Sequence, residues 1–313
     1  MSKNYDTIII GAGPAGLAAG LYAARGRLKT LILEKGQVGG QITSTYEIDN
    51  YPGSRDKPTG PILAERMREQ CENFGAQIAQ EEVKSIEKEN KLFRIQTNKG
   101  SYETKTMIIS TGAEPRLAGF KGEMEYRGRG VSYCATCDAG FFKGLHVVVI
   151  GGGDAAVEEG IYLTKFANKV TIIHRRDKLR AAKSIQEKAF SNKKIDFIWD
   201  SVVEEVKGEG VVQSLVLRNK KTNEISELKA EGVFVYVGYT PNSKLFEGLV
   251  KIDEKGYIIG DQEMRTNVSG IFVAGDVRQK SLKQIITAAA DGAIAGVNAE
   301  KYISKNFEAE GNL

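Results

Sequence analysis

Cysteine and histidine are scarce in this chain of 313 residues, which has three cysteines (Cys71, Cys134 and Cys137) and two histidines. A secreted scaffold held by disulfides would carry more cysteines, so the composition favours a reducing, cytoplasmic compartment. A zinc site usually needs four ligands at set spacings, and one close cysteine pair with two distant histidines does not supply them. We therefore expect no metal, and a static disulfide clip is disfavoured in a reducing compartment.

Long apolar runs and a strong net charge are missing as well. No run approaches the roughly 18 residues that a membrane span requires, and the N-terminal region enters a strand-like segment, "YDTIII", without a signal-peptide pattern. A net charge of +4 is small for this length, so neither nucleic acid nor an anionic membrane is expected as a partner. With 41% hydrophobic and 27% charged residues, the composition is typical of a globular chain with about two domains.

The first segment, "YDTIIIGAGPAGLAAGLYAARGRLKTLILEK", predicts a strand, a glycine-rich turn, a helix and a second strand. Gly11, Gly13 and Gly16 form G-x-G-x-x-G, in which the first glycine permits the turn, the second admits a pyrophosphate and the third allows close helix packing. Glu34, at the end of the second strand, can bind both ribose hydroxyls and would repel a 2′-phosphate. The segment therefore predicts a site for the adenosine half of FAD or NAD, the alternative being a glycine-rich turn without a nucleotide.

A second copy of this pattern occurs in "LHVVVIGGGDAAVEEGIYLTKFANKVTIIHRRDKLRA". Gly151, Gly153 and Ala156 give G-x-G-x-x-A between a strand and a helix that is predicted to begin near Asp154. The second strand leads into the basic residues His174, Arg175, Arg176 and Arg180. Three arginines can bind a 2′-phosphate through forked, charge-assisted hydrogen bonds, so NADPH is expected here. The alternative, a solvated basic start of a helix, explains one such arginine better than three.

Near the C-terminus, "GIFVAGDV" places Asp276 at the end of a predicted strand, and a helix is expected from about Gln284. Asp276 could bind the ribityl chain of a flavin, and the positive end of the helix would stabilise negative charge on the reduced flavin ring. Asp276 could instead be the N-cap of a helix. The fold class predicted from all these segments is α/β, with two Rossmann-like dinucleotide-binding domains of three-layer ββα type.

The segment "SYCATCDAGFF" contains the close cysteine pair, Cys134 and Cys137. With a metal and a static clip disfavoured, a redox-active dithiol is the leading interpretation, because C-x-x-C disulfides exchange readily. The thiolate that leaves on reduction needs a proton, and the adjacent Asp138 is the nearest candidate acid. Burial would have to raise the pKa of Asp138 for this role. The alternative is a surface aspartate that begins a turn.

These residues resemble the low-molecular-weight, bacterial-type thioredoxin reductases, on the motifs "GAGPAG", "GGQIT", "CATCDAGFF", "GGGDAAVEEG", "HRRDKLRA" and "GDV…QIITAAADGAIA". The resemblance covers nearly the whole chain and implies a homodimer whose NADPH domain is inserted in its FAD domain. The FAD domain would span residues 1–115 and 242–313, and the NADPH domain, which carries the cysteine pair, residues 116–241.

The resemblance also assigns residues to each cofactor. The FAD contacts that it implies are Gly11, Gly13, Ala15, Gly16, Glu34, Gly40, Gln41, Asn50, Thr111, Gly112, Asp276 and Gln284. The NADPH contacts that it implies are Gly151, Gly153, Asp154, Ala155, His174, Arg175, Arg176 and Arg180. Ala155 departs from the serine or threonine of many relatives, which a turn built from backbone should tolerate.

The function that follows is a thioredoxin-disulfide reductase that moves electrons from NADPH through FAD and Cys134–Cys137 to thioredoxin. Because the cysteine pair lies on the nicotinamide-binding side of the chain, we expect that domain to rotate between half-reactions. Within the same chemistry the partner could be a glutaredoxin-like or peroxiredoxin-linked redoxin. A flavin dithiol oxidase and a ferredoxin-fed flavoprotein are alternatives that would have no use for the three arginines, and a non-enzymatic binding module would have no use for the cysteine pair.

Overall fold

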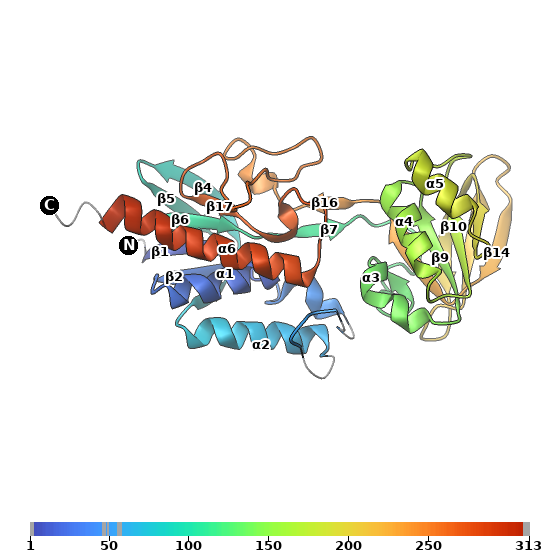
Figure 1. The fold of residues 1–313 in the computed structure, drawn as a ribbon, viewed down its shortest axis with the longest axis horizontal. Coiled ribbons are helices and arrows are strands. Elements are labelled where there is room, and N and C mark those ends of the chain that lie inside the picture. The colour runs from blue at the N-terminus through green and yellow to red at the C-terminus, as the bar shows by residue number, and fades with distance from the viewer. Residues whose placement is uncertain (1–2, 46–47, 49, 55–57, 309–313) are drawn as a thin grey trace. The chain divides into compact units, whose positions relative to one another are not determined.

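The computed structural model describes residues 3–45, 48, 50–54 and 58–308. The chain divides into two compact units, Met1–Glu114 with Thr240–Leu313, and Pro115–Tyr239 (Figure 1). The second unit is therefore an insertion in the first. The chain passes between the units through β7 (Ala113–Pro115) and β16 (Tyr239–Pro241), and these two short strands pair with each other.

The first unit is built on a sheet whose strand order, within the described residues, is β3-β2-β1-β6-β5-β4, with β17 paired to β6. The bounds are β1 (Lys3–Ile10), β2 (Thr30–Glu34), β3 (Gln77–Gln80), β4 (Val83–Glu89), β5 (Leu92–Thr97), β6 (Ser101–Ile109) and β17 (Ile271–Val273). The strands β1, β2, β3, β6 and β17 run parallel, whereas β5 pairs antiparallel with β6 and with β4. Because parallel strands end at one edge of a sheet, the turns that follow β1, β2, β6 and β17 all lie along that edge.

The helices of the first unit are α1 (Pro14–Arg25), α2 (Gly60–Asn73) and α6 (Ile285–Ile303), with the shorter helical segments η1 (Gly40–Ser44), η3 (Lys244–Phe246), η4 (Gly275–Val277) and η5 (Ser304–Glu308). Figure 1 shows α6 running alongside α1. Glycines make this approach possible: a Cβ added to Gly292 would lie 2.0 Å from the carbonyl oxygen of Ala15, and one added to Gly296 would lie 2.6 Å from that of Ala19. Helix α6 is thus fitted closely to α1.

The second unit has a parallel sheet in the order β11-β10-β9-β15-β8, counted over the residues that the structure describes. Its strands are β8 (Val131–Ser132), β9 (His146–Gly151), β10 (Lys169–Ile173), β11 (Ile195–Ile198) and β15 (Gly232–Tyr236). The helical segments are α3 (Ala135–Asp138), η2 (Ala139–Phe142), α4 (Asp154–Leu163) and α5 (Lys183–Phe190), and β12 (Ser201–Lys207), β13 (Ser214–Asn219) and β14 (Ile225–Lys229) form an antiparallel meander. The predicted α/β class with two parallel-sheet units is confirmed.

The apolar runs that predicted central strands are buried on both faces. Ile8 and Ile9 in β1, and Val147, Val148 and Val149 in β9, have no exposed surface, as expected for parallel strands covered on both sides. In the described part of the chain, no helix combines the length and the apolar character that a membrane crossing requires.

Candidate functional site

The turn between β1 and α1 has the geometry of a nucleotide-binding loop. A Cβ on Gly11, whose φ is +104°, would lie 2.5 Å from the carbonyl oxygen of Ser110, and one on Gly16 would lie 1.8 Å from the carbonyl oxygen of Gly11. A Cβ on Gly13, in contrast, would meet no described atom within 4 Å. Packing therefore requires the first and third glycines, and the second leaves its backbone open to a ligand.

Glu34 stands at the end of β2 beside this turn. Its Oε2 accepts a hydrogen bond from the backbone N–H of Ala12 at 2.7 Å, and its Oε1 accepts one from that of Gly36 at 2.7 Å. The same side chain lines a cavity of about 460 Å³, together with Arg68 and Gln80. These two hydrogen bonds fix the carboxylate beside the glycine turn, where it could receive ribose hydroxyls.

Further predicted flavin contacts meet the same edge of the first sheet. A Cβ on Gly40 would lie 3.4 Å from the Cα of Gly13, so η1 borders the turn. Asn50 Nδ2 donates to Gln284 Oε1 at 3.1 Å, joining two predicted residues that are far apart in the sequence. Separately, Gln41 Nε2 donates to the carbonyl oxygen of Ala113.

The segment after β6 supplies the next two predicted residues. Thr111 Oγ1 donates to the carbonyl oxygen of Asn242 at 2.6 Å, and Gly112, with a φ of +70°, accepts the N–H of Asn242 at 3.0 Å. Ser110, which the sequence did not single out, donates to the carbonyl oxygens of Ile10 and Gly11 at 3.0 and 2.9 Å. This segment is thus locked against the first glycine turn.

Asp276 has the features of a ligand-binding group. Gly275 has a φ of +77°, and its Cβ would lie 2.7 Å from that of Ala15, so η4 lies directly against the start of α1. Asp276 Oδ1 is buried and accepts no hydrogen bond from the residues that the structure describes. Burial raises the pKa of this carboxyl group. A buried carboxylate oxygen that accepts no hydrogen bond from these residues fits a hydroxyl of a bound ribityl chain. The N-cap of α6 is Gln284 and not Asp276.

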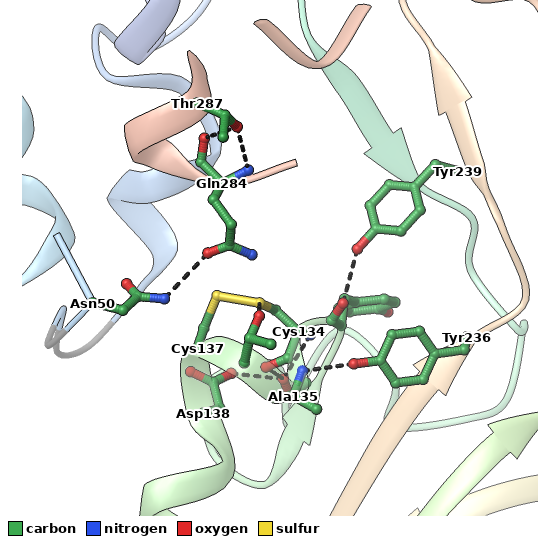
Figure 2. The surroundings of a disulfide bond; sticks show 12 residues. Asn50, Cys134, Ala135, Cys137, Asp138, Tyr236, Tyr239, Gln284 and Thr287 are labelled. Atoms are coloured by element: carbon green, nitrogen blue, oxygen red, sulfur yellow. Dashed lines mark hydrogen bonds between the residues drawn. A yellow bond between two sulfur atoms is a disulfide. The ribbon is translucent and has the colours of Figure 1, made fainter. Parts of the chain in front are cut away.

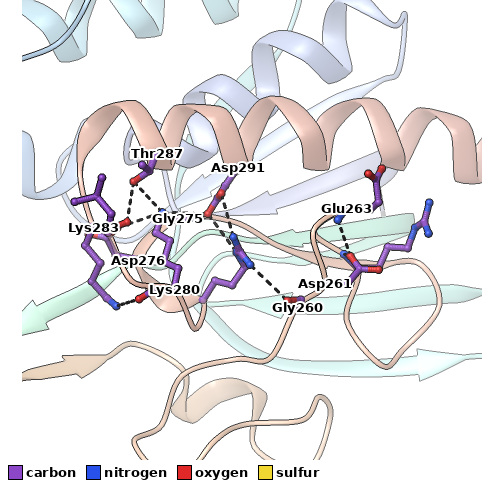
Figure 3. Close-up of polar contacts among 12 residues, drawn as sticks. Gly260, Asp261, Glu263, Gly275, Asp276, Lys280, Lys283, Thr287 and Asp291 are labelled. Carbon is purple, nitrogen blue, oxygen red and sulfur yellow. Dashed lines mark hydrogen bonds and ion pairs between the residues drawn. The ribbon is translucent and has the colours of Figure 1, made fainter.

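A network of buried charges surrounds Asp276 (Figure 3). Lys280 Nζ lies 3.1 Å from Asp291 Oδ2 and 3.8 Å from Asp276 Oδ1. Asp291, on α6, also accepts the backbone N–H of Gly275 at 3.1 Å and faces Arg278 at 3.4 Å. The sequence analysis did not identify Arg278, Lys280 or Asp291. The two lysines and one arginine within six positions after "GDV" are nevertheless a detectable signal of a charged cluster. The network holds η4 to α6.

The turn between β9 and α4 repeats the features of the first. A Cβ on Gly153 would meet no described atom within 4 Å, and one on Gly152 would lie 2.3 Å from the ring of His174. His174 is only 4% exposed, and burial, followed by the charge of Arg180, lowers its pKa. Its backbone N–H donates to the carbonyl oxygen of Ile198 at 2.9 Å. The imidazole ring of His174 therefore lies directly against the glycine turn.

The basic segment is tied to this turn by two hydrogen bonds. The backbone N–H of Arg180 donates to the carbonyl oxygen of Gly152 at 2.6 Å, and the N–H of Ala182 donates to Asp154 Oδ1 at 2.7 Å. Arg175, Arg176 and Arg180 are exposed, as are the predicted residues Asp154 and Ala155. Within the described ranges these arginines form no ion pair with a carboxylate, so their guanidinium groups are available to a phosphate.

The cysteine pair follows β8 and forms a disulfide in the structure, with the two Cα atoms 5.3 Å apart (Figure 2). Cys134 caps the short helix α3, which carries Cys137 and ends at Asp138. Ser132 Oγ accepts the backbone N–H of Cys134 at 3.1 Å and donates to Asp138 Oδ2 at 2.6 Å. The predicted acid is thus half-buried and held in place beside the disulfide by Ser132, a residue that sequence reasoning missed.

The disulfide and the second glycine turn share one edge of a sheet. β8 and β9 both run parallel to β15, which lies between them, so the residues after β8 and after β9 emerge on the same side. The described residues contain no group of three or more His, Cys, Asp or Glu side chains that could hold a metal ion.

Comparison with known proteins identifies similar chains. The family described as "Pyridine nucleotide-disulphide oxidoreductase" matches residues 5–292. A thioredoxin reductase from Peptoclostridium acidaminophilum is 55% identical, covering 98% of this chain and 100% of its own. The crystal structure of thioredoxin reductase from Streptococcus pyogenes is 49% identical, covers 97% of this chain and 100% of its own, and has a TM-score of 0.93. The crystal structure of Lactococcus lactis thioredoxin reductase in the FR conformation is also 49% identical, covers 96% of this chain and 99% of its own, and has a TM-score of 0.67.

Proposed function

Because the chain belongs to the thioredoxin reductases of the pyridine nucleotide-disulphide oxidoreductase family, we propose that it uses NADPH to reduce the disulfide of a thioredoxin, with FAD and Cys134–Cys137 as its redox centres. The observation that carries the proposal is a disulfide at the same sheet edge as a glycine turn that is followed by three exposed arginines. A dithiol oxidase or a ferredoxin-fed enzyme would have no use for those arginines.

The side chains around the two glycine turns serve to bind and orient the dinucleotides. When bound, NADPH supplies a hydride and FAD relays its two electrons. Arg175, Arg176 and Arg180 hold the 2′-phosphate, which distinguishes NADPH from NADH by charge-assisted hydrogen bonds. Glu34 receives the ribose hydroxyls of FAD, and Asp276 Oδ1, which accepts no hydrogen bond from the described residues, receives a ribityl hydroxyl.

Reduction of the Cys134–Cys137 disulfide consumes two electrons and two protons and leaves two thiols. Asp138, held by the Ser132 hydroxyl at 2.6 Å, is the group placed to give a proton to the thiolate that leaves. One cysteine then attacks the disulfide of thioredoxin as a thiolate and forms a mixed disulfide. The second cysteine displaces the thioredoxin thiolate, which restores Cys134–Cys137 and leaves thioredoxin as a dithiol.

Rotation of the second unit about β7 and β16 is part of the proposal. The disulfide and the predicted NADPH turn both belong to the second unit, whereas the predicted flavin contacts belong to the first. Nicotinamide and disulfide must each reach the flavin, and the dithiol must reach a protein partner, so one rigid arrangement does not serve every step. Crosslinking the units should abolish turnover with thioredoxin and leave one half-reaction intact, and full turnover in the crosslinked enzyme would overturn the rotation.

Anaerobic titration with NADPH tests the central claim. We expect the wild-type protein to be reduced in two stages, of flavin and of dithiol, and then to reduce added thioredoxin. The Cys137→Ser variant should bleach its flavin with NADPH and show no second stage. An absorption spectrum that NADPH leaves unchanged would refute the proposal, and reduction by ferredoxin or electron transfer to oxygen alone would favour the alternatives.

Two further inferences concern assembly and location. From the resemblance alone we infer that the protein is a homodimer, which light scattering on the purified protein would test. We also infer a cytoplasmic location, which fits the scarcity of cysteine and which cell fractionation would test.

A further inference from the structure

Two tyrosine hydroxyl groups hold the backbone on either side of Cys134 (Figure 2). Tyr236 Oη accepts the N–H of Ala135 at 2.6 Å, and Tyr239 Oη donates to the carbonyl oxygen of Tyr133 at 2.8 Å. Burial raises the pKa of the Tyr236 phenol, so this group stays neutral and keeps its hydroxyl near physiological pH. The peptide groups before and after the first redox cysteine are therefore both fixed by side chains that are distant in the sequence.

Both tyrosines come from the segment by which the chain returns to the first unit. Tyr236 ends β15, and Tyr239 begins β16 two residues after Val237. Between them, the carbonyl oxygen of Gly238 accepts the N–H of Arg116, at 2.8 Å, from the segment by which the chain enters the second unit. A change in the backbone of this return segment would thus be transmitted directly to the peptide groups that flank Cys134.

The segment by which the chain enters the second unit is also linked to Tyr133, through the side chain of Glu123. Tyr133 Oη donates to Glu123 Oε1 at 2.8 Å. The carboxylate of Glu123, which is only 3% exposed, also accepts the backbone N–H groups of Ala118 and Gly119 at 2.8 and 2.7 Å. These bonds fix Tyr133, the residue directly before Cys134, to the beginning of the second unit.

We propose that Tyr236 and Tyr239 are positioning residues that favour the disulfide form of Cys134–Cys137 over the dithiol form. A disulfide requires its two Cα atoms to stay close, here 5.3 Å apart, whereas two thiols, whose sulfur atoms are not bonded, have no such requirement. When the disulfide takes up two electrons and two protons, the two Cα atoms are free to move apart. Side chains that hold the backbone around Cys134 in its present position oppose this movement and therefore oppose reduction. This role rests on the proposed function, in which the pair cycles between the two forms.

The redox equilibrium of the cysteine pair measures this role. The flavoprotein is equilibrated in dithiothreitol redox buffers, its thiols are alkylated, and the dithiol fraction is read by mass spectrometry, with the buried Cys71 as a constant background. The variants are Tyr239→Phe and Tyr236→Phe. The matched control is Tyr126→Phe, which also removes a phenol hydroxyl that donates to a backbone carbonyl, that of Gly208 at 2.7 Å, but does not touch the redox segment.

We expect Tyr239→Phe and Tyr236→Phe each to shift the equilibrium toward the dithiol by about fivefold, the effect of one ordinary hydrogen bond. For a two-electron couple this is about 20 mV toward a less negative potential. Tyr126→Phe should leave the potential at the wild-type value. A loss of thermal stability common to all three variants with no change in potential would overturn the proposal, because it would assign the hydroxyls a purely structural role.

The same variants separate this inference from the proposed function. If the wild-type protein fails to reduce thioredoxin with NADPH but the potential shifts in Tyr239→Phe, the positioning role stands and the proposed function fails. If the wild-type protein reduces thioredoxin but the potential of Tyr239→Phe equals that of Tyr126→Phe, the proposed function stands and the positioning role is overturned.

Discussion

Replacement of Lys280 by methionine should lower the free energy of unfolding of the first unit. The loss should exceed that caused by breaking the surface ion pair between Lys84 and Glu82, although the surface pair is shorter. The Lys280 side chain is only 8% exposed, and its Nζ lies 3.1 Å from Asp291 Oδ2 and 3.8 Å from Asp276 Oδ1. Methionine keeps most of the length of the side chain and removes its charge. The buried carboxylate of Asp291, whose side chain is 9% exposed, would then lose its nearest cation, and the carboxylate of Asp276, which is 33% exposed, would lose a weaker partner.

The size of the effect follows from burial. Removing one partner of a buried ion pair costs about 3–5 kcal/mol of unfolding free energy. Arg278 still faces Asp291 at 3.4 Å, so we expect the lower end, about 3 kcal/mol. Lys84→Met is the matched control in the same unit: Lys84 Nζ lies 2.5 Å from Glu82, but the two side chains are 52% and 49% exposed. That loss should cost about 0–1 kcal/mol.

The assay is unfolding followed by two signals. Far-UV circular dichroism reports both units, and Trp199, the single tryptophan of the chain, reports the second. Lys280→Met should lower the melting temperature of the first unit by about 6–12 °C and leave the Trp199 transition in place. In an Asp291→Asn background, Lys280→Met should lower the free energy of unfolding by a smaller amount, because the ion pair between Lys280 and Asp291 is already broken. A loss no larger than that of Lys84→Met would refute the reasoning.

Three other outcomes are expected. Arg176→Gln should raise the KM for NADPH about tenfold to a hundredfold, because a charge-assisted hydrogen bond to the 2′-phosphate is lost. The KM for NADH should stay unchanged. Steady-state kinetics with both nucleotides measure the two values. Gly292→Ala should cost about 1–3 kcal/mol in thermal unfolding, because its Cβ would lie 2.0 Å from a carbonyl oxygen of α1, whereas Gly140→Ala, with no described atom within 4 Å of its Cβ, should be nearly neutral. The pKa of His174 is lowered in the folded state, so the unfolded chain binds a proton at a higher pH than the folded chain does. The stability of the second unit should therefore fall as the pH falls through about 6.5. His174→Asn should weaken this pH dependence when unfolding is followed by Trp199 fluorescence.

The parts of the site that local spacing determines could be predicted from the sequence. The glycine turns, Glu34 at its strand end, and helices beginning at Asp154 and directly after Gln284 agree with the structure, because strand–turn–helix periodicity is a property of neighbouring residues. The resemblance to thioredoxin reductases is confirmed by relatives that cover nearly the whole chain. The cofactor and proton-donor roles of individual residues remain predictions.

Contacts between distant segments could not be predicted. Tyr239 holds the carbonyl group of Tyr133 across 106 positions, and no spacing rule connects them. The sequence alone also left open whether Asp276 is the N-cap of the last long helix, which the structure excludes because α6 begins after Gln284; the ligand role of Asp276 remains a prediction. The cluster of basic residues after "GDV" could be noticed in the sequence, but the burial of Lys280 could not, because its partner Asp291 lies on α6, 11 positions further along the chain.

The close fit of α6 to α1 has a consequence for synthesis on the ribosome. β17 and α6 complete the sheet and helix layer of the first unit, yet they are translated after the whole of the second unit. The inserted unit is contiguous, so it can fold while the growing chain is still attached. Until α6 emerges, the small-residue face of α1 and the edge of β6 that receives β17 stay uncovered. A chaperone that shields nascent chains should therefore bind the N-terminal segment for longest, and release it when the last helix docks.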